Sequence, residues 1–457
     1  MISNIDLWIV IIYLALTLVI GFIASGRTHS LSQYSVAGRN FSWPIIFATL
    51  SASYIGGGFT TGNAEKVFSL GLLSAFALWG FSLKEILVAK VIVPRMEKFR
   101  DMISVGEIMG SVYGRWAQVL TGFFGTLLCA GIMGAQVGAM GYVFELFLGI
   151  ERWLGILIGC GIVIVYTTIG GMRAVIYTDV IQFAILAIGI PLALILAIIH
   201  LDGPSGFITA VPLSHLDIWG QMTPFAFIVL FISFLVGETL VPPYVQRLLI
   251  GKNLKHTSRG TFYSGLFSIP FFVITGLIGL AALAINPDLN PNLALPFVVQ
   301  TVLPVGLEGL VVAAIIAIVM SSADSFLNSA SVNITNDIIK PLFPGKISEK
   351  GQLKIAMATT VIVGVLAVIV AVSITSILDI LLFAYKFWAP VILIPLVAAL
   401  LGKRPPTYAF LGSALVGFLA TWLTGFYTDM GTPYELCAGV LGSLVVFVSL
   451  CWFSSRA

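Results

Sequence analysis

The sequence predicts an all-α polytopic membrane protein in which about 13 helices cross the bilayer. Of its 457 residues, 59% are apolar and only 9% are charged, whereas about 25% are charged in an average soluble domain. A soluble fold cannot bury so much apolar surface. The expected spans, at ~20 apolar residues per crossing, lie near 6–24, 43–66, 71–93, 116–147, 153–170, 176–200, 223–247, 260–285, 306–336, 354–374, 377–401, 407–426 and 436–454.

Two of these spans are interrupted by glycine or proline. Residues 53–59 contain a run of three glycines, and residues 237–243 end in two prolines. A broken helix leaves backbone groups unpaired, which hydrocarbon tolerates only where they face protein, water or a ligand. Paired breaks in corresponding halves of a chain indicate the binding site of a secondary transporter built from inverted repeats.

Basic residues orient the chain in the membrane. In the 13-span arrangement Arg152 lies alone on one side, and the positive-inside rule assigns the other, basic side to the cytoplasm. We therefore expect a multi-pass protein of the plasma (inner) membrane with its N-terminus outside and its C-terminus in the cytoplasm. The basic residues on the cytoplasmic side are Arg27, Arg39, Arg95, Lys98, Arg100, Arg115, Arg173, Arg247, Lys252, Lys255, Arg259, Lys340, Lys346, Lys350, Lys354, Lys403, Arg404 and Arg456.

This topology divides the chain into two five-helix sets of opposite orientation, residues 43–200 and 223–401. Each set begins with one broken helix, which is the LeuT-type 5+5 inverted repeat. Residues 1–42 are expected to form a peripheral first helix and loop, 201–222 an external loop, and 402–457 two peripheral C-terminal helices.

Composition also excludes several classes of function. The net charge of +3 is too small to suggest a nucleic-acid partner. The four cysteines lie in or beside apolar runs without metal-ligand spacing, which is typical of buried reduced thiols. No histidine or nucleophile constellation suggests an enzyme, and no obligate protein partner is evident; the expected partners are a small solute, sodium ions and the lipid bilayer.

The span near 306–336 carries four polar residues on one helical face, since Ser321, Asp324, Ser325 and Asn328 follow one another at i, i+3, i+4 and i+7. Hydroxyls and a carboxylate supply the oxygen ligands that a hard cation prefers. Small residues could instead serve close helix packing. Asp324 favours the ion site, because an intramembrane carboxylate is costly and usually functional.

Asp179 stands near the start of the sixth span. It could be a second cation ligand or an ion-exit group near the cytoplasm. It could instead be a carboxylate favoured by the helix dipole, or the partner of Arg173.

Glu238 lies in the second helix break, where an unpaired carboxylate would be expensive. It must meet a cation, a proton or a basic side chain such as Lys386. Pairing with Lys386 and contact with the solute both remain open at this stage. The neighbours Lys84 and Glu85 do not face each other on a helix, so each is expected to find a partner elsewhere.

Three short segments resemble signatures of the sodium/solute symporter family, and the resemblance extends over about 43–400. One runs from Gly170-Gly171 to Tyr177-Thr178-Asp179 and Gln182, another covers residues 320–325, and the third is Tyr244-Val245-Gln246-Arg247. The resemblance implies one or two Na⁺ sites. It assigns the principal site to backbone carbonyls near Tyr54, Gly57 and Ile318 with the hydroxyls of Ser321 and Ser322, and a second site to Asp179, Ser321, Asp324 and Ser325.

Within the family, residues 51–58 and 63–65 look similar to the high-affinity choline transporter branch. The aromatic set that encloses choline in that branch falls here at Tyr54, Phe81, Met133 and Val241, of which two are not aromatic. The substrate-binding residues expected for this chain are Tyr54, Gly58, Phe81, Met133, Glu238, Val241 and Lys386.

The function expected from these features is Na⁺-coupled symport that imports a small organic solute by alternating access. An amino acid, a betaine- or choline-like amine, or another zwitterion would suit Glu238 and Lys386 together. One alternative is a proton-coupled carrier of the same fold, in which Asp179, Asp324 or Glu238 titrates. An alternative from another class is a substrate-sensing membrane receptor, which the absence of an attached signalling domain disfavours.

Overall fold

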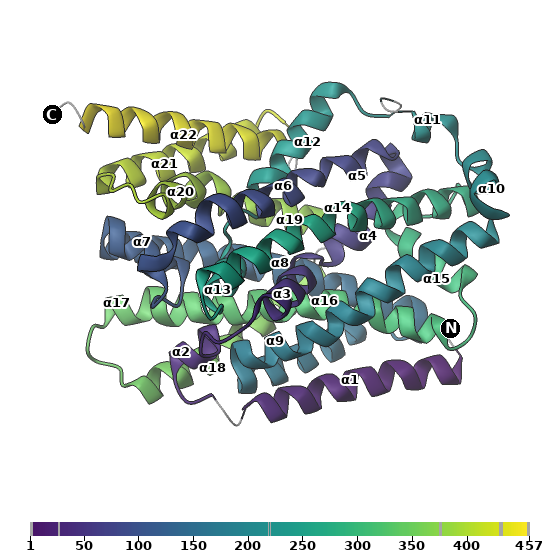
Figure 1. The fold of residues 1–457 in the computed structure, drawn as a ribbon, viewed down its shortest axis with the longest axis horizontal. Coiled ribbons are helices and arrows are strands. Elements are labelled where there is room, and N and C mark those ends of the chain that lie inside the picture. Colours follow the sequence, from purple (N-terminus) through teal and green to yellow (C-terminus); the bar gives the residue numbers. More distant parts are fainter. Residues whose placement is uncertain are drawn as a thin grey trace.

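The computed structural model describes residues 3–25, 28–217, 219, 221–373, 377–428 and 433–454. Arg27 and Arg456, two of the basic residues used for orientation, lie outside the described residues. Throughout the described ranges the chain is helical, without a β-strand, and one isolated bridge joins Phe41 to Gly251. This confirms the predicted all-α class (Figure 1).

Within these ranges, nine helices are long and apolar enough to cross a membrane by length and composition. They are α1 (Asn4–Ser25), α8 (Arg115–Leu148), α9 (Arg152–His200), α14 (Leu254–Ile285), α16 (Leu307–Val332) with its extension through η5 (Asn333–Ile339) and α17 (Lys340–Leu342), α18 (Glu349–Ser373), the segment Phe383–Leu400 that runs from α19 (Ile377–Tyr385) through η6 (Ala389–Leu393) into α20 (Ile394–Leu400), α21 (Thr407–Gly425), and α22 (Pro433–Ser454).

The other elements are shorter, and among them are the halves of both broken helices. They are α2 (Leu31–Val36), α3 (Trp43–Tyr54), α4 (Gly57–Leu70), α5 (Leu73–Ala77), α6 (Trp79–Leu87), η1 (Val88–Ile92), η2 (Val93–Arg95), η3 (Glu97–Phe99), α7 (Val105–Tyr113), α10 (Gly203–Ala210), α11 (Leu213–Leu216), α12 (Pro224–Val236), α13 (Pro242–Leu249), η4 (Pro291–Leu293) and α15 (Ala294–Val302). The predicted external loop 201–222 thus contains two short helices.

The break between α3 and α4 occurs at Ile55 and Gly56, where the glycine run predicts it. Ile55 leaves the helical region, with φ −75° and ψ 65°, and Gly56 is extended. The break between α12 and α13 covers residues 237–241, where Leu240 has a φ of +54° before Pro242 starts the second half. A positive φ in a non-glycine residue is strained and is often found at functional sites. Both predicted breaks are confirmed.

Gly171 divides α9 into two helices. Its φ of +56° and ψ of −152° are not helical, and a Cβ there would lie 2.6 Å from Cδ2 of Tyr34. Glycine is the residue that tolerates both this conformation and this contact. The division agrees with the separate spans predicted at 153–170 and 176–200.

The helix α16 lies at the centre of the molecule. In its most apolar stretch 94% of the residues are buried, against 28% in α1, α21 and α22. It packs on α8 and α9, where small residues such as Ala314 allow close approach: a Cβ on Gly189 would lie 3.1 Å from that of Ala314. The polar face predicted around residue 324 is therefore deep inside the bundle.

Figure 1 shows which segments share an end of the bundle. The N-terminus, α10, α11 and α15 lie at the right-hand end, and α7, α17 and the C-terminus lie at the left-hand end. Segments predicted to be external therefore lie together, away from segments predicted to be cytoplasmic.

Candidate functional site

The first helix break meets the central helix at Ser322. The Ser322 hydroxyl donates a hydrogen bond of 2.7 Å to the carbonyl of Ser53, in the last turn of α3. Carbonyls at the end of a helix lack an intrahelical donor and are free to take other partners. A Cβ on Gly56 would lie 2.5 Å from the Ser322 hydroxyl, so the close approach requires glycine. Ser321 and Ser322, the two serines predicted for the principal ion site, are both buried.

Gln136 of α8 holds the other side of this break. Its side-chain oxygen accepts a hydrogen bond of 2.8 Å from the backbone N–H of Gly57, the first residue of α4. The first N–H groups of a helix have no intrahelical acceptor. Gln136 therefore satisfies a group that the break would otherwise leave unpaired, and it connects α8 to the start of α4.

Asp179 lies in a fully buried polar cluster with Ser321, Thr49 and Arg247. One carboxylate oxygen accepts from the Ser321 hydroxyl at 2.5 Å. The other accepts from Arg247 at 2.9 Å and also from the Thr49 hydroxyl. The same Arg247 nitrogen donates to Ser325 at 2.6 Å. The alternative that Asp179 pairs with Arg173 is wrong, because Arg247 takes that place and Arg173 donates to the carbonyl of Ala37.

Asp324 has different partners. Tyr166 donates to one of its oxygens at 2.6 Å and Ser325 to the other at 3.0 Å. The structure thus brings Asp179, Ser321, Asp324 and Ser325 into one hydrogen-bonded group, which also includes a buried guanidinium. A buried ion pair is stable only when further hydrogen bonds satisfy its remaining atoms, and the hydroxyls around Arg247 do so.

Glu238, in the second break, is held by two tyrosines. Tyr244 donates to one carboxylate oxygen at 2.5 Å and Tyr385 to the other at 2.6 Å. Lys84 approaches the same residue from α6, and its ammonium lies 3.3 Å from the Glu238 carbonyl and 2.9 Å from the carboxylate of Glu85. Lys84 thus has the expected partner elsewhere, but the expectation that Lys84 and Glu85 do not meet each other is wrong.

Lys386 does not pair with Glu238. Its ammonium forms an ion pair with Glu435 of α22, and both side chains are almost fully buried. The hypothesis of a Glu238–Lys386 pair is wrong for this structure, because the two tyrosines take up the carboxylate and the peripheral helix supplies the partner of the lysine.

A small buried cavity lies between the two breaks. Its volume is about 10 Å³, about the room that one water molecule needs, so it must widen to hold an organic solute. It is lined by Ser53, Tyr54, Gly56, Gly58, Phe59, Ile132, Gln136, Glu238, Tyr244, Ser322, Phe326 and Leu381. Tyr54, Gly58 and Glu238 of the expected substrate-binding residues are therefore in its wall. Phe81, Met133 and Val241 are buried nearby without lining it, and Lys386 lies with α22.

The comparison with known families agrees with this geometry. The family model described as "Sodium:solute symporter family" matches residues 34–417, far more than half of the chain. The chain belongs to the sodium:solute symporter family.

The relatives of this symporter are transporters, and the three named here align with nearly its whole length. The sodium/glucose cotransporter of Vibrio parahaemolyticus is 26% identical over 97% of this chain and 84% of its own. The osmoregulated proline transporter OpuE of Bacillus subtilis is 23% identical over 97% of this chain and 94% of its own. The high-affinity choline transporter 1 of Drosophila melanogaster is 25% identical over 97% of this chain and 77% of its own. The chain is thus a multi-pass membrane transporter and not an enzyme, and its family supports Na⁺-coupled solute symport.

A solved structure of a Na⁺-coupled sialic acid symporter, in a substrate-bound outward-open state, has the same fold. It aligns with a TM-score of 0.86 at 22% identity, covering 99% of this chain and 98% of its own. A nucleobase-cation-symport-1 transporter, Mhp1, in a closed conformation aligns with a TM-score of 0.61 at 15% identity. These similarities concern the LeuT-type fold alone.

Sequence reasoning missed several polar residues of the symporter's centre. Gln136, Tyr166 and Thr49 were not predicted, and Arg247 entered only as a cytoplasmic basic residue and as part of a family signature. Gln136 and Arg247 carry a usable signal, because a strongly polar side chain inside an apolar span needs a buried partner. Which partner it has depends on the packing of helices far apart in the sequence.

Proposed function

We propose that this symporter uses the Na⁺ gradient to import a small organic solute that carries a cationic nitrogen, with Glu238 as the anchor of that nitrogen. The observation that carries the proposal is the environment of Glu238. Its carboxylate lines the cavity between the two breaks and accepts from Tyr244 and Tyr385. A carboxylate among aromatic rings suits an ammonium, through charge and through cation–π attraction.

The proposed solutes are an amino acid, a betaine- or choline-like amine, or another zwitterion. Four rings line the cavity, from Tyr54, Phe59, Tyr244 and Phe326. Because Lys386 is engaged by Glu435, it is removed from the proposed substrate contacts. If the solute also carries a carboxylate, the amide of Gln136 is a donor in the cavity wall that could meet it.

The proposed principal Na⁺ site lies where the first break meets α16. It consists of the Ser321 and Ser322 hydroxyls with backbone carbonyls at Tyr54, Gly57 and Ile318. The contact between the Ser322 hydroxyl and the carbonyl of Ser53 supports it and adds a neighbouring oxygen. Na⁺ bound there would connect α3 to α16 and so favour the conformation in which these helices are close. A ligand shifts such an equilibrium only by binding one state more tightly.

The proposed second Na⁺ site consists of Asp179, Ser321, Asp324 and Ser325. Here Arg247 already donates to Asp179 and Ser325. An ion in this site must therefore compete with the guanidinium for the same oxygens. Occupation would accompany a shift of Arg247, which joins the ion to the movement of α13.

The proposed topology has 13 crossings, with each broken helix counted as one and α9 as two. Residues 43–200 and 223–401 would form the inverted repeats, flanked by 1–42, 201–222 and 402–457, with the N-terminus outside the plasma membrane and the C-terminus inside. The two breaks and the kink at Gly171 support this count.

Uptake into proteoliposomes tests the function. Labelled proline, choline and glycine betaine are supplied with an inward Na⁺ gradient, with a pH gradient alone, and with neither. Accumulation of one of them that requires Na⁺ supports the proposal. Accumulation driven by pH without Na⁺ would establish the proton-coupled alternative, and Na⁺-independent binding without uptake would favour a receptor.

A further inference from the structure

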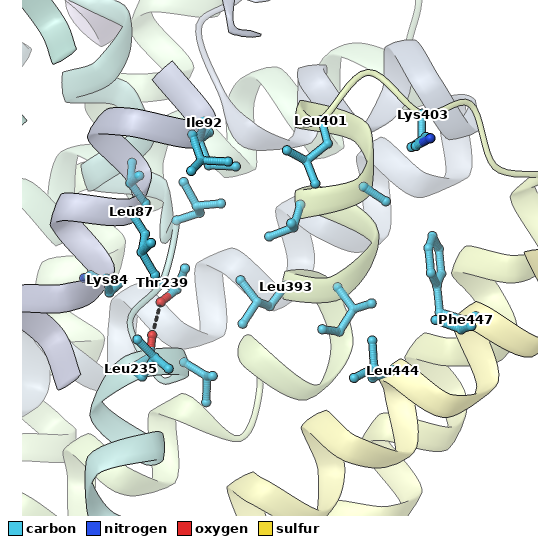
Figure 2. Close-up of a pocket in the computed structure, with 18 residues that line it drawn as sticks. Lys84, Leu87, Ile92, Leu235, Thr239, Leu393, Leu401, Lys403, Leu444 and Phe447 are labelled. Carbon is cyan, nitrogen blue, oxygen red and sulfur yellow. Dashed lines mark hydrogen bonds between the residues drawn. The ribbon is translucent and has the colours of Figure 1, made fainter. Parts of the chain in front are cut away.

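A second, larger cavity opens on the side of the molecule; it shares no lining residue with the cavity between the two breaks. It has a volume of about 520 Å³, within the 300–1,000 Å³ typical of ligand pockets. One wall is formed by α6 and η1, the facing wall by α20, the outer wall by α22, and the floor by the end of α12 and the second break. Figure 2 shows these walls with Leu87, Leu393 and Leu444 directed into the space.

The lining is almost entirely aliphatic. Fifteen of its 18 residues are apolar, and the other three are Lys84, Thr239 and Lys403. Thr239 donates its hydroxyl to the carbonyl of Leu235 at 2.5 Å (Figure 2). The ammonium of Lys84 is bound by Glu85 and by the carbonyl of Glu238, so only its stem contributes to the wall. The deep part of this cavity, which we call the lateral groove, therefore favours an apolar ligand.

The groove has a polar character at one end only. Lys403 lies there, next to Leu401 and across from Ile92 (Figure 2). Lys403 and the following Arg404 are exposed. On the opposite wall Arg95 donates to the carbonyl of Val91, a lining residue. Cations at the mouth and aliphatic side chains behind it match a molecule with an anionic head and a hydrocarbon tail.

We propose that the lateral groove binds one anionic phospholipid, with an acyl chain against α6, α20 and α22 and its phosphate at Lys403 and Arg404. The mouth lies on the side that the basic residues assign to the cytoplasm, where anionic lipids attract basic residues near the membrane surface. The floor of the groove includes Thr239 and Leu240, so the lipid would support the unwound segment that carries Glu238.

The experiment measures lipid retention by the purified full-length symporter. Detergent-solubilised protein is incubated with dioleoyl phosphatidylglycerol or with dioleoyl phosphatidylcholine, and retained lipid is counted by native mass spectrometry. We expect the wild type to retain one phosphatidylglycerol and markedly less phosphatidylcholine. Equal retention of the two lipids would overturn the anionic headgroup site.

Two variants test the two ends of the groove. Ala398→Trp places a large ring in the groove and should abolish retention. The double variant Lys403→Gln/Arg404→Gln should weaken phosphatidylglycerol binding by about fivefold for each charge removed and leave phosphatidylcholine unchanged. Retention by Ala398→Trp equal to wild type would overturn the proposed location.

Two matched controls exclude general effects. Ala184→Trp adds the same ring to an exposed position on α9, and Lys346→Gln/Lys350→Gln removes two exposed charges, one between α17 and α18 and one in the first turn of α18. Both should retain lipid as the wild type does. Melting temperatures of all four variants verify that they are folded, and a loss of retention in the controls as large as in the groove variants would overturn the site.

Discussion

At the residue scale, the two candidate sites depend on single side chains that reach a broken helix from a different element. Ser322 comes to the first break from α16, and Tyr385 comes to the second from α19. Each makes a hydrogen bond to a group that lies in or beside a break. Substitution of these groups should therefore change ligand affinity more than it changes folding.

Ser322→Ala should lower the apparent Na⁺ affinity by about tenfold. It removes one of the oxygen ligands that a hard cation needs, and the loss of such a contact costs about as much as the loss of one hydrogen bond to a charged group. The measurement is uptake as a function of Na⁺ concentration. The control is Ser331→Ala on the same helix, where the lost hydroxyl donates to the carbonyl of Asn328 in the preceding turn. If both variants give the wild-type Na⁺ curve, Ser322 is not a ligand.

Glu238→Gln should weaken solute binding by about 2–5 kcal/mol, the usual cost of removing one partner from a buried charge pair. Na⁺ affinity should be nearly unchanged, because Ser321 and Ser322 remain. Isothermal titration with the solute found by uptake measures the change.

The matched control for Glu238 is Glu435→Gln. It neutralises a second buried carboxylate, which pairs with Lys386 and not with the cavity. It should lower the melting temperature and leave solute affinity within about a factor of two, since Glu435 does not line the cavity. Wild-type solute affinity in Glu238→Gln would contradict the proposed anchor.

At the scale of elements, the junction of α3, α9, α13 and α16 is held by one ion pair and its hydroxyl partners. Asp179 and Arg247 are both fully buried. Removal of either partner should destabilise the protein by about 3–5 kcal/mol, because the other charge is left without compensation. The double variant Asp179→Leu/Arg247→Met should regain much of this loss, as measured by thermal unfolding in detergent.

The pair of Arg100 and Glu97 is the control for this cycle. It is solvent-exposed, with side-chain exposures of 32% and 69%, and Glu97→Gln should change stability by no more than about 1 kcal/mol. If the double variant of the buried pair is as unstable as the sum of its single variants, the two charges do not act as a pair.

The first helix break gives a second prediction at this scale. Gly56→Ala would place a methyl group 2.5 Å from the Ser322 hydroxyl and 3.0 Å from the amide of Gln136, which should cost about 1–3 kcal/mol of overpacking and reduce Na⁺ affinity. Gly62→Ala, further along the first broken span in α4, meets only the carbonyl of Gly57 at 3.8 Å and should be tolerated. Equal Na⁺ affinities in the two variants would show that the break does not need this close approach.

The elements were more predictable from sequence than their contacts. Both breaks follow from local glycine and proline, and the division of α9 follows from Gly171, because backbone conformation depends on neighbouring residues. The pairing of Lys386 with Glu435 and of Asp179 with Arg247 could not be predicted. Each joins elements separated by dozens of residues, and a sequence holds several equally charged candidates until the helices are packed.

At the scale of the whole molecule, apolar composition and burial divide the helices into two groups. The most apolar stretch of α16 is 94% buried, whereas those of α1, α21 and α22 are only 28% buried. Asp324 and the cluster of Asp179 and Arg247 gather around the central helix, whereas the buried pair of Lys386 and Glu435 lies at α22. This division explains why a chain with only 9% charged residues can hold several buried charges: the peripheral helices face lipid and keep the charged centre away from hydrocarbon.

The proposed topology leads to the last prediction, which concerns the two ends of the bundle. With the N-terminus outside and about 13 crossings, the segment after α17 faces the cytoplasm and the segment before η4 faces outward. Lys346 and Asp288 are exposed in these two segments. In a variant without the four native cysteines, Lys346→Cys should react with a membrane-impermeant maleimide only after the cells are opened, and Asp288→Cys should react in intact cells.

An even number of crossings between residues 288 and 346 would expose both cysteines to the same side. Equal labelling of the two in intact cells would therefore refute the odd number of crossings assigned to this stretch. Reaction of Lys346→Cys alone in intact cells would reverse the proposed orientation, with the N-terminus then inside.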